Sequence, residues 1–461
     1  MKKLFKIFRQ AIRGEEEDFT SGSIRRAIVL LSIPMVLEML MEGLFALVDA
    51  WWVSKVSVDA VATVGLTESV ITLVYSIAIG LSAAVTAMVA RRVGEGKPEK
   101  AGEVTVQATW LALFIAAVIG VAGFVFAEDI LRLMGGSEEL IAACSGYTRI
   151  MFGTNGVIML LFVFNAVFRG AGNAAYAMWV LWLSNGINLI LDPLFIFGIG
   201  PFPELGVTGA AVATSIGRGI GVGLQIYLLF RGRGMVKLVL NKLQLQWKLI
   251  RQLISIGAGG TGQYLIMSAS WIFLMRIIAE FGSESLAGYT IAIRIIIFTF
   301  MPVWGLSNAA ATLVGQNLGA GKPERAERSS WLTAHYTMFF LLFVSIILFS
   351  TAHWTIPRFN AHPEVVEAGI LALRIFCASY VMFAYGLVFS QSFNGAGDTR
   401  TPTITNFFCF WMLEIPLAWF LATQLEWGLA GVCWAVAISE ATMSLVMIWL
   451  FRKGRWKRVA I

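Results

Sequence analysis

The chain has 461 residues, of which 58% are hydrophobic and only 14% are charged. Soluble domains carry about 25% charged residues, so this composition excludes an ordinary soluble protein and indicates a membrane protein. The formal net charge of +7 is spread over many short loops. Basic residues placed in this way act as topology signals and lipid contacts, so the charge gives no support to a nucleic-acid partner.

The first 26 residues form a basic amphipathic segment. Its sequence, MKKLFKIFRQAIRGEEEDFTSGSIRR, has apolar residues at helical spacing with basic residues between them. It lacks the long apolar run and the small-residue cleavage site of a signal peptide. We therefore expect a short helix at the cytoplasmic membrane interface.

Twelve apolar stretches follow, each long enough to cross the hydrocarbon core, which is about 30 Å thick, as a helix. They cover residues 27–53, 60–90, 104–127, 140–168, 174–199, 206–230, 250–280, 286–316, 329–352, 365–392, 402–423 and 427–451. The sequence therefore predicts an all-α membrane protein with twelve transmembrane helices.

The basic residues orient these helices in the membrane. Of the 35 Lys and Arg residues, 27 lie in the two terminal segments or in alternate loops, and only Lys55, Arg132 and Arg358 lie in the remaining loops. Loops rich in Lys and Arg stay on the cytoplasmic side. We therefore expect a multi-pass protein of the cytoplasmic (inner) membrane with both termini in the cytoplasm.

The chain also repeats itself. Residues 93–101 (VGEGKPEKA) resemble residues 318–326 (LGAGKPERA), and residues 168–173 (FRGAGN) resemble residues 393–398 (FNGAGD), both at an offset of 225 residues. Each repeat contains six spans, an even number, so the two halves run parallel and are related by a pseudo-two-fold axis near the membrane normal. Two such lobes enclose a cleft suited to alternating access.

These observations divide the chain into five parts. The predicted parts are an amphipathic segment (1–26), an amino-terminal lobe (27–231), a cytoplasmic linker (232–249), a carboxy-terminal lobe (250–452) and a basic tail (453–461).

The chain resembles the multidrug and toxic compound extrusion (MATE) transporters of prokaryotes. The resemblance covers nearly the whole chain and is carried by the Gly-Lys-Pro loops, FRGAGN, FNGAGDTRTP, FALVDAWWVSKVS and NLILDPLFIFGIGPFPELGVTGAAVAT. It implies two six-helix lobes and export of amphipathic, often cationic, compounds coupled to Na⁺ or H⁺. Relatives outside this branch flip lipid-linked sugars.

Acidic residues within the spans require a function or a partner, because each costs about 2.5–3.5 kcal/mol near the membrane centre. Glu38, Glu42, Phe45 and Asp49 share one face of the first span. Asn185, Asn188 and Asp192 share one face of the fifth span. From their depths we expect five residues to form one polar site in the amino-terminal lobe: Asp49, Asn155, Asn188, Asp192 and Thr214.

Such an oxygen-rich site suits Na⁺, and a pair of carboxylates equally suits a proton. The resemblance places the family's cation site on Asp49, Asn188 and Asp192, and Phe45 stands where a tyrosine is often found. Glu414, the repeat partner of Asp192, is expected to play an auxiliary part in substrate or proton binding, and Glu38 and Glu42 are further auxiliary acids.

Two charged residues stand at nearly equivalent positions of the two halves, Glu68 in the second span and Arg294 in the eighth. We expect them to form a gate pair across the cleft when its outer mouth closes. The alternative is that each pairs within its own lobe, Glu68 with Arg218 and Arg294 with Glu440.

The sequence favours a cation-coupled exporter with no cofactor other than the coupling ion. A lipid-linked oligosaccharide flippase is the alternative, but only five basic residues lie within the spans and acids on the first helix oppose an anionic substrate. No catalytic constellation supports an enzyme, and the repeat with buried acids argues against a channel. The expected partners are small amphipathic cations and the lipid bilayer, and we expect a monomer.

Overall fold

The computed structural model describes residues 2–15, 17–232, 236 and 244–461, and these residues form helices without any strand. Twelve described spans are long and apolar enough to cross a membrane. This confirms the predicted fold class of two six-helix lobes. Most helices extend beyond the predicted stretches into polar residues, because a helix needs apolar side chains only where it crosses the lipid.

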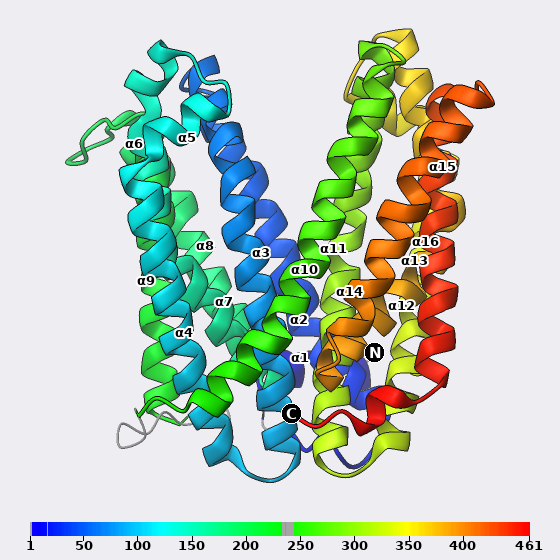
Figure 1. Cartoon of the computed structure of the whole chain (residues 1–461). Coiled ribbons are helices and arrows are strands. Elements are labelled where there is room, and N and C mark those ends of the chain that lie inside the picture. Colours follow the sequence, from blue (N-terminus) through cyan, green and yellow to red (C-terminus); the bar gives the residue numbers. More distant parts are fainter. Residues whose placement is uncertain (1, 16, 233–235, 237–243) are drawn as a thin grey trace.

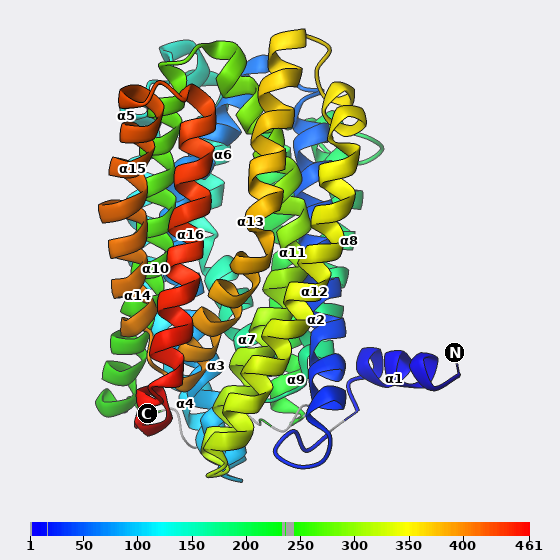
Figure 2. The same ribbon diagram turned by 90° about the vertical axis from the view of Figure 1, so that its right-hand side faces the viewer.

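The amino-terminal lobe follows the short helix α1 (Lys2–Arg13). Its helices are α2 (Ile24–Val53), α3 (Val58–Gly94), α4 (Pro98–Val125), α5 (Ala127–Leu133), α6 (Glu138–Gly153), α7 (Asn155–Gly170), α8 (Ala174–Phe197) and α9 (Val207–Phe230). Helix α1 lies across the direction of the spans, to one side of the bundle (Figure 2), as an amphipathic interfacial helix would.

The carboxy-terminal lobe begins with α10, and most of the predicted linker, residues 233–235 and 237–243, lies outside the described residues. Its helices are α10 (Trp247–Ala279), α11 (Ser283–Gly319), α12 (Pro323–Thr355) with the 3₁₀ turn η2 (Ile356–Arg358), α13 (Pro363–Ala396), α14 (Arg400–Asn406), α15 (Ile415–Trp419) and α16 (Gly428–Arg452), and a last 3₁₀ turn η5 (Arg455–Arg458) follows.

Two spans depart from a single regular helix. The fourth span breaks at Thr154. The hydroxyl of Thr154 donates a hydrogen bond to the carbonyl of Ile150 at 2.7 Å, and the side-chain amide of Asn155 donates one to the carbonyl of Phe152 at 2.5 Å. The eleventh is π-helical over η3 (Phe407–Glu414) and η4 (Phe420–Gln424). Pro416 lies between these segments and removes one backbone donor, which favours the wider winding.

The repeated Gly-Lys-Pro motif forms the same turn in each lobe. Gly96 and Gly321 adopt left-handed conformations with φ of 70° and 69°, and the following prolines begin α4 and α12. Glycine tolerates this conformation without a steric cost, and proline suits the first turn of a helix. The repeat is therefore explained by local backbone geometry.

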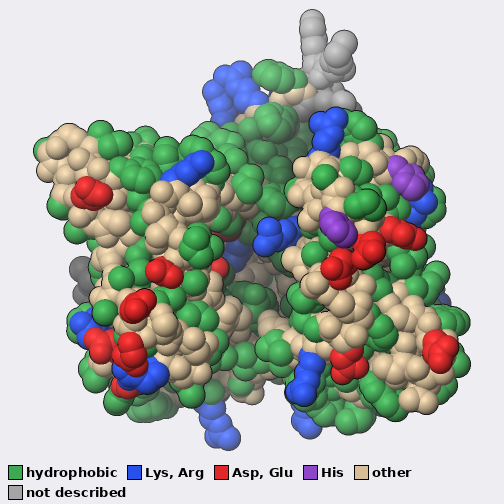
Figure 3. Space-filling view, turned by 90° about the horizontal axis from the view of Figure 1, so that it is seen from above, with side chains coloured by type: hydrophobic (Ala, Val, Ile, Leu, Met, Phe, Trp, Pro, Cys, Tyr) green, Lys and Arg blue, Asp and Glu red, His purple; other side chains and the backbone are tan. Residues whose placement is uncertain are grey.

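The two lobes diverge toward one end of the molecule and meet at the end where both termini lie (Figure 1). We call these the open end and the terminal end. Seen from the open end, the side chains leave a hollow between the lobes (Figure 3).

At the terminal end the lobes meet backbone to backbone through glycines. A Cβ atom on Gly94 would lie 2.7 Å from the carbonyl carbon of Gln316, and one on Gly319 would lie 3.0 Å from that of Arg91. Gly94 and Gly319 are repeat partners at the offset of 225, and so are Arg91 and Gln316. The closure therefore obeys the internal symmetry.

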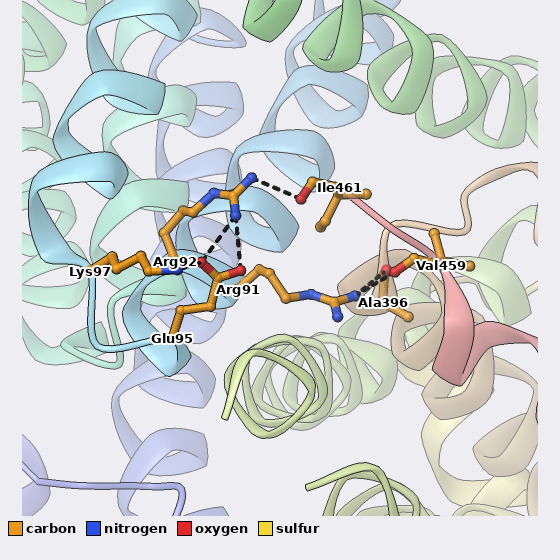
Figure 4. Close-up of polar contacts among 7 residues, drawn as sticks. All are labelled: Arg91, Arg92, Glu95, Lys97, Ala396, Val459 and Ile461. Atoms are coloured by element: carbon orange, nitrogen blue, oxygen red, sulfur yellow. Dashed lines mark hydrogen bonds and ion pairs between the residues drawn. The ribbon is translucent and has the colours of Figure 1, made fainter. Parts of the chain in front are cut away.

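Polar side chains extend this closure. Arg91 donates to the carbonyl of Ala396 at 3.1 Å, and Gln316 donates to the carbonyl of Gly170 at 3.0 Å, so each reaches the glycine-rich turn of the opposite lobe. Arg91 and Arg92 also donate to the carbonyls of Val459 and Ile461 in the tail (Figure 4). The tail is thus held against the amino-terminal lobe.

Candidate functional site

The predicted polar face of α2 points into the amino-terminal lobe, but its acids have different partners. Glu38 is 1% exposed, and its Oε1 accepts from Arg169 of α7 at 3.0 Å and from Asn165 at 3.4 Å. A buried carboxylate is costly unless it is paired. The charge of Glu38 is therefore already balanced by Arg169, and the contacts of Glu38 hold α2 against α7.

Glu42 lies one turn further along α2 and joins α8 and α9. Its Oε2 accepts from Asn185 at 3.0 Å, and its Oε1 accepts from Arg218 at 3.3 Å. Arg218 also donates to the hydroxyl of Tyr75 at 3.0 Å, and its guanidinium lies 5.5 Å from the ring centre of Phe45. A guanidinium that is only 4% exposed therefore stands at the centre of the lobe.

Four of the five predicted site residues come together beyond this pair. The amide nitrogen of Asn188 donates to Asp192 Oδ1 at 3.2 Å and to Thr214 Oγ1 at 3.0 Å. The carboxyl of Asp49 lies beside that of Asp192. Helices α2, α8 and α9 thus bring two carboxyls, an amide and a hydroxyl to one buried place.

Three oxygens at this place have no hydrogen-bond donor within the described part of the chain: Asp49 Oδ1, Asn188 Oδ1 and Asp192 Oδ2. A buried acceptor without a donor costs about 1–3 kcal/mol. Oxygen ligands are those that a hard cation prefers, and adjacent carboxyls can hold one proton between them. The arrangement therefore fits Na⁺ or H⁺ chemically.

The structure does not bring the fifth predicted residue, Asn155, into this group. Its amide nitrogen donates to the carbonyls of Ala116 and Phe152, at the break between α6 and α7. No contact in the described residues joins it to Asp49 or Asp192. The depth of a residue along its span could be estimated from the sequence, but the break at Thr154 turns this side chain toward α4.

From the sequence, Arg218 is expected only as an alternative partner of Glu68. In the structure, the ion-pair partner of Arg218 is Glu42. Arg218 stands one turn after Thr214 on α9, a spacing that could have placed it beside the site. Tyr147 was also missed. It is 4% exposed and lies within the electrostatic reach of Asp49, Glu68 and Arg218.

Glu68 and Arg294, the expected gate pair, are both exposed in this conformation. Glu68 lies within the electrostatic reach of Arg218, in keeping with the alternative pairing inside the lobe. No ion pair in the described residues joins Arg294 to Glu68 or to Glu440. Because the lobes are separated at the open end, the gate between Glu68 and Arg294 stays a prediction for the closed mouth.

Glu414 is 3% exposed and ends the π-helical segment of the eleventh span. The charged group that acts on it is Glu440 of α16, and Tyr289 of α11 lies nearby. Asp192 has the amide of Asn188 beside it, whereas Trp411 near Glu414 donates its indole N–H to the carbonyl of Ile266 at 3.0 Å. The carboxy-terminal lobe therefore repeats the acid without its amide partners.

Comparison with known proteins gives a consistent result. The family model MatE matches the chain twice, over residues 34–194 and 261–420, once in each lobe. The "Probable multidrug resistance protein NorM" of Thermotoga maritima is 26% identical, over 99% of this chain and 97% of that protein. The "FAD transporter" of Shewanella oneidensis is 26% identical, over 94% of this chain and 95% of that protein.

Solved structures agree with the fold over the whole chain. A crystal structure of MATE in the straight conformation superimposes with a TM-score of 0.88 at 27% identity, covering 98% of this chain and 99% of that chain. A structure described as the outward-facing conformation of a multidrug resistance MATE family transporter has a TM-score of 0.88 at 25% identity and covers 98% of both chains.

Proposed function

Since this chain belongs to the MatE family of membrane transporters, we propose that it exports amphipathic organic cations in exchange for Na⁺ or H⁺. The exchange takes place by alternating access of the cleft between the lobes, in the cytoplasmic membrane. The terminal end faces the cytoplasm, as the distribution of Lys and Arg indicates.

The observation that carries this proposal is the cluster of unpartnered buried oxygens from Asp49, Asn188 and Asp192. A transporter couples two fluxes when the ion and the substrate favour different conformations. These oxygens lie on α2 and α8, so a bound Na⁺ or proton would draw the two helices together. Coupling then follows from a change in helix packing inside the amino-terminal lobe.

The names of the relatives point to two substrate classes, drug-like compounds and the anion FAD. Several are called multidrug proteins, whereas one is called an FAD transporter, and FAD is an anion. In this chain Glu42, Asp49 and Glu68 lie around Arg218, and Asp192 lies beside Asp49. This excess of acids favours cations and opposes an anion or the polyphosphate of a lipid-linked sugar.

The test is transport by the purified chain in proteoliposomes. Ethidium uptake into inside-out vesicles is measured under an imposed Na⁺ gradient and, separately, under a pH gradient. Asp192→Asn and Asp49→Asn are expected to abolish gradient-driven uptake while the protein stays folded and inserted. Asp129→Asn, which changes an exposed aspartate paired with Arg132 outside the spans, is the matched control and should transport normally. Gradient-driven transport at the wild-type rate in Asp192→Asn would falsify the assignment of the site.

A further inference from the structure

Arg218 is a buried charged side chain of the amino-terminal lobe that the proposed coupling site does not use. Its side chain is 5% exposed, whereas that of its partner Glu42 is 35% exposed. Burial of a guanidinium is tolerated only where its charge is balanced. The direct pair with Glu42 supplies that balance, at 3.3 Å.

The groups facing Arg218 come from four helices. They are Glu42 and Asp49 of α2, Glu68 and Tyr75 of α3, Tyr147 of α6 and, through Asp49, Asp192 of α8. Asp49 and Asp192 lie against each other at the coupling site. Of the remaining acids, Glu42 is neutralised by contact and Glu68 is exposed.

Glu68 is exposed on α3, and no ion pair among the described residues involves it. It lies two turns from Tyr75 on the same face of α3, and Tyr75 accepts a hydrogen bond from Arg218 and is within the electrostatic reach of Tyr264 in the opposite lobe. The upper part of α3 runs along the side of its lobe that faces the other lobe (Figure 1). A substrate in the hollow between the lobes would therefore meet Glu68 as an acid without an ion-pair partner and Glu42 as one half of an ion pair.

We propose that Arg218 sets the substrate charge that this lobe accepts. By neutralising Glu42 it leaves one carboxylate, Glu68, for the positive charge of a substrate, so that monocations are preferred to dications. This inference rests on the proposed export of organic cations and adds the residue that selects among them. Arg218 acts through Glu42 and is a positioning residue.

The test compares two dyes that share one aromatic core, ethidium with one positive charge and propidium with two. Their affinities for the purified full-length chain in nanodiscs are measured by fluorescence, and the ratio is taken for each variant. Arg218→Gln frees the carboxylate of Glu42 and is expected to raise the relative affinity for propidium about tenfold, the size expected for one added charge about 12 Å from the dye's second cation at an effective dielectric constant of about 20. Arg218→Lys keeps the charge and should keep the ratio.

The reciprocal variant changes the ratio in the opposite direction. Glu42→Gln leaves Arg218 without a partner, so both dyes should bind more weakly and propidium should lose more. The double variant, which lacks both charges, should return close to the wild-type ratio. Arg149→Gln, which breaks the half-exposed pair with Glu128, is the control and should leave the ratio unchanged.

A ratio unchanged in both Arg218→Gln and Glu42→Gln, with ethidium still bound, overturns the role of Arg218 and leaves the proposed function standing. An equal loss of both dyes in Arg218→Gln indicates a merely structural role and also overturns it. If neither dye binds the wild-type chain, the proposed substrate class fails, and the inference fails with it.

Discussion

Replacement of Gly94 or Gly319 by alanine should force the lobes apart at the terminal end. A Cβ atom at position 94 would lie 2.7 Å from the carbonyl carbon of Gln316, whereas ordinary contacts begin at 3.4 Å. The carbonyl oxygen of Gln316 would lie closer still, so the backbones must separate, and overpacking of this kind costs about 1–3 kcal/mol. The equilibrium should shift by about 5- to 150-fold toward the conformation open at this end.

The separation can be measured with spin labels on Cys residues at positions 97 and 322, in the two equivalent Gly-Lys-Pro loops. The four native cysteines are buried, so the introduced sites label selectively. In Gly94→Ala and Gly319→Ala the longer-distance population should grow. Gly223→Ala is the matched control, because it adds the same methyl group within a helix where no atom lies within 4 Å. A wild-type distance distribution in folded Gly94→Ala would refute the reasoning.

Three further predictions concern other charged groups. Glu414→Gln should weaken substrate binding or change its pH dependence, and unchanged affinity at every pH would mean that the residue is structural. Cysteines at positions 68 and 294 should cross-link only when the open end closes. If they never cross-link in any condition, while cysteines at positions 68 and 218 link readily, the gate is contradicted. Burial raises the pKa of Glu95, but hydrogen bonds from Arg92 and Lys97 prevail and hold that pKa below its usual 4.5. Its stabilisation is therefore full above pH 4.5 and lost as the pH falls through the lowered pKa, so thermal unfolding should lose part of its acid sensitivity in Glu95→Gln.

The sequence alone determined the twelve spans, their grouping into two lobes and the face of α2 that carries the acids. These properties are encoded locally, because the length of an apolar run and the spacing of acids along one helix do not depend on distant residues. The offset of 225 residues likewise predicts the parallel arrangement of the lobes without reference to any contact. For the same reason Asp49, Asn188, Asp192 and Thr214 could be expected at one depth.

Only the tertiary structure decided which charges meet. Glu42 pairs with Arg218, 176 residues away, and Glu38 pairs with Arg169, 131 residues away. Such pairs depend on how each helix is rotated against its neighbours, and the break at Thr154 shows how one local irregularity redirects Asn155. The close approach of Gly94 to Gln316 is equally invisible in the sequence, because an absent side chain has meaning only when the opposing backbone is in place.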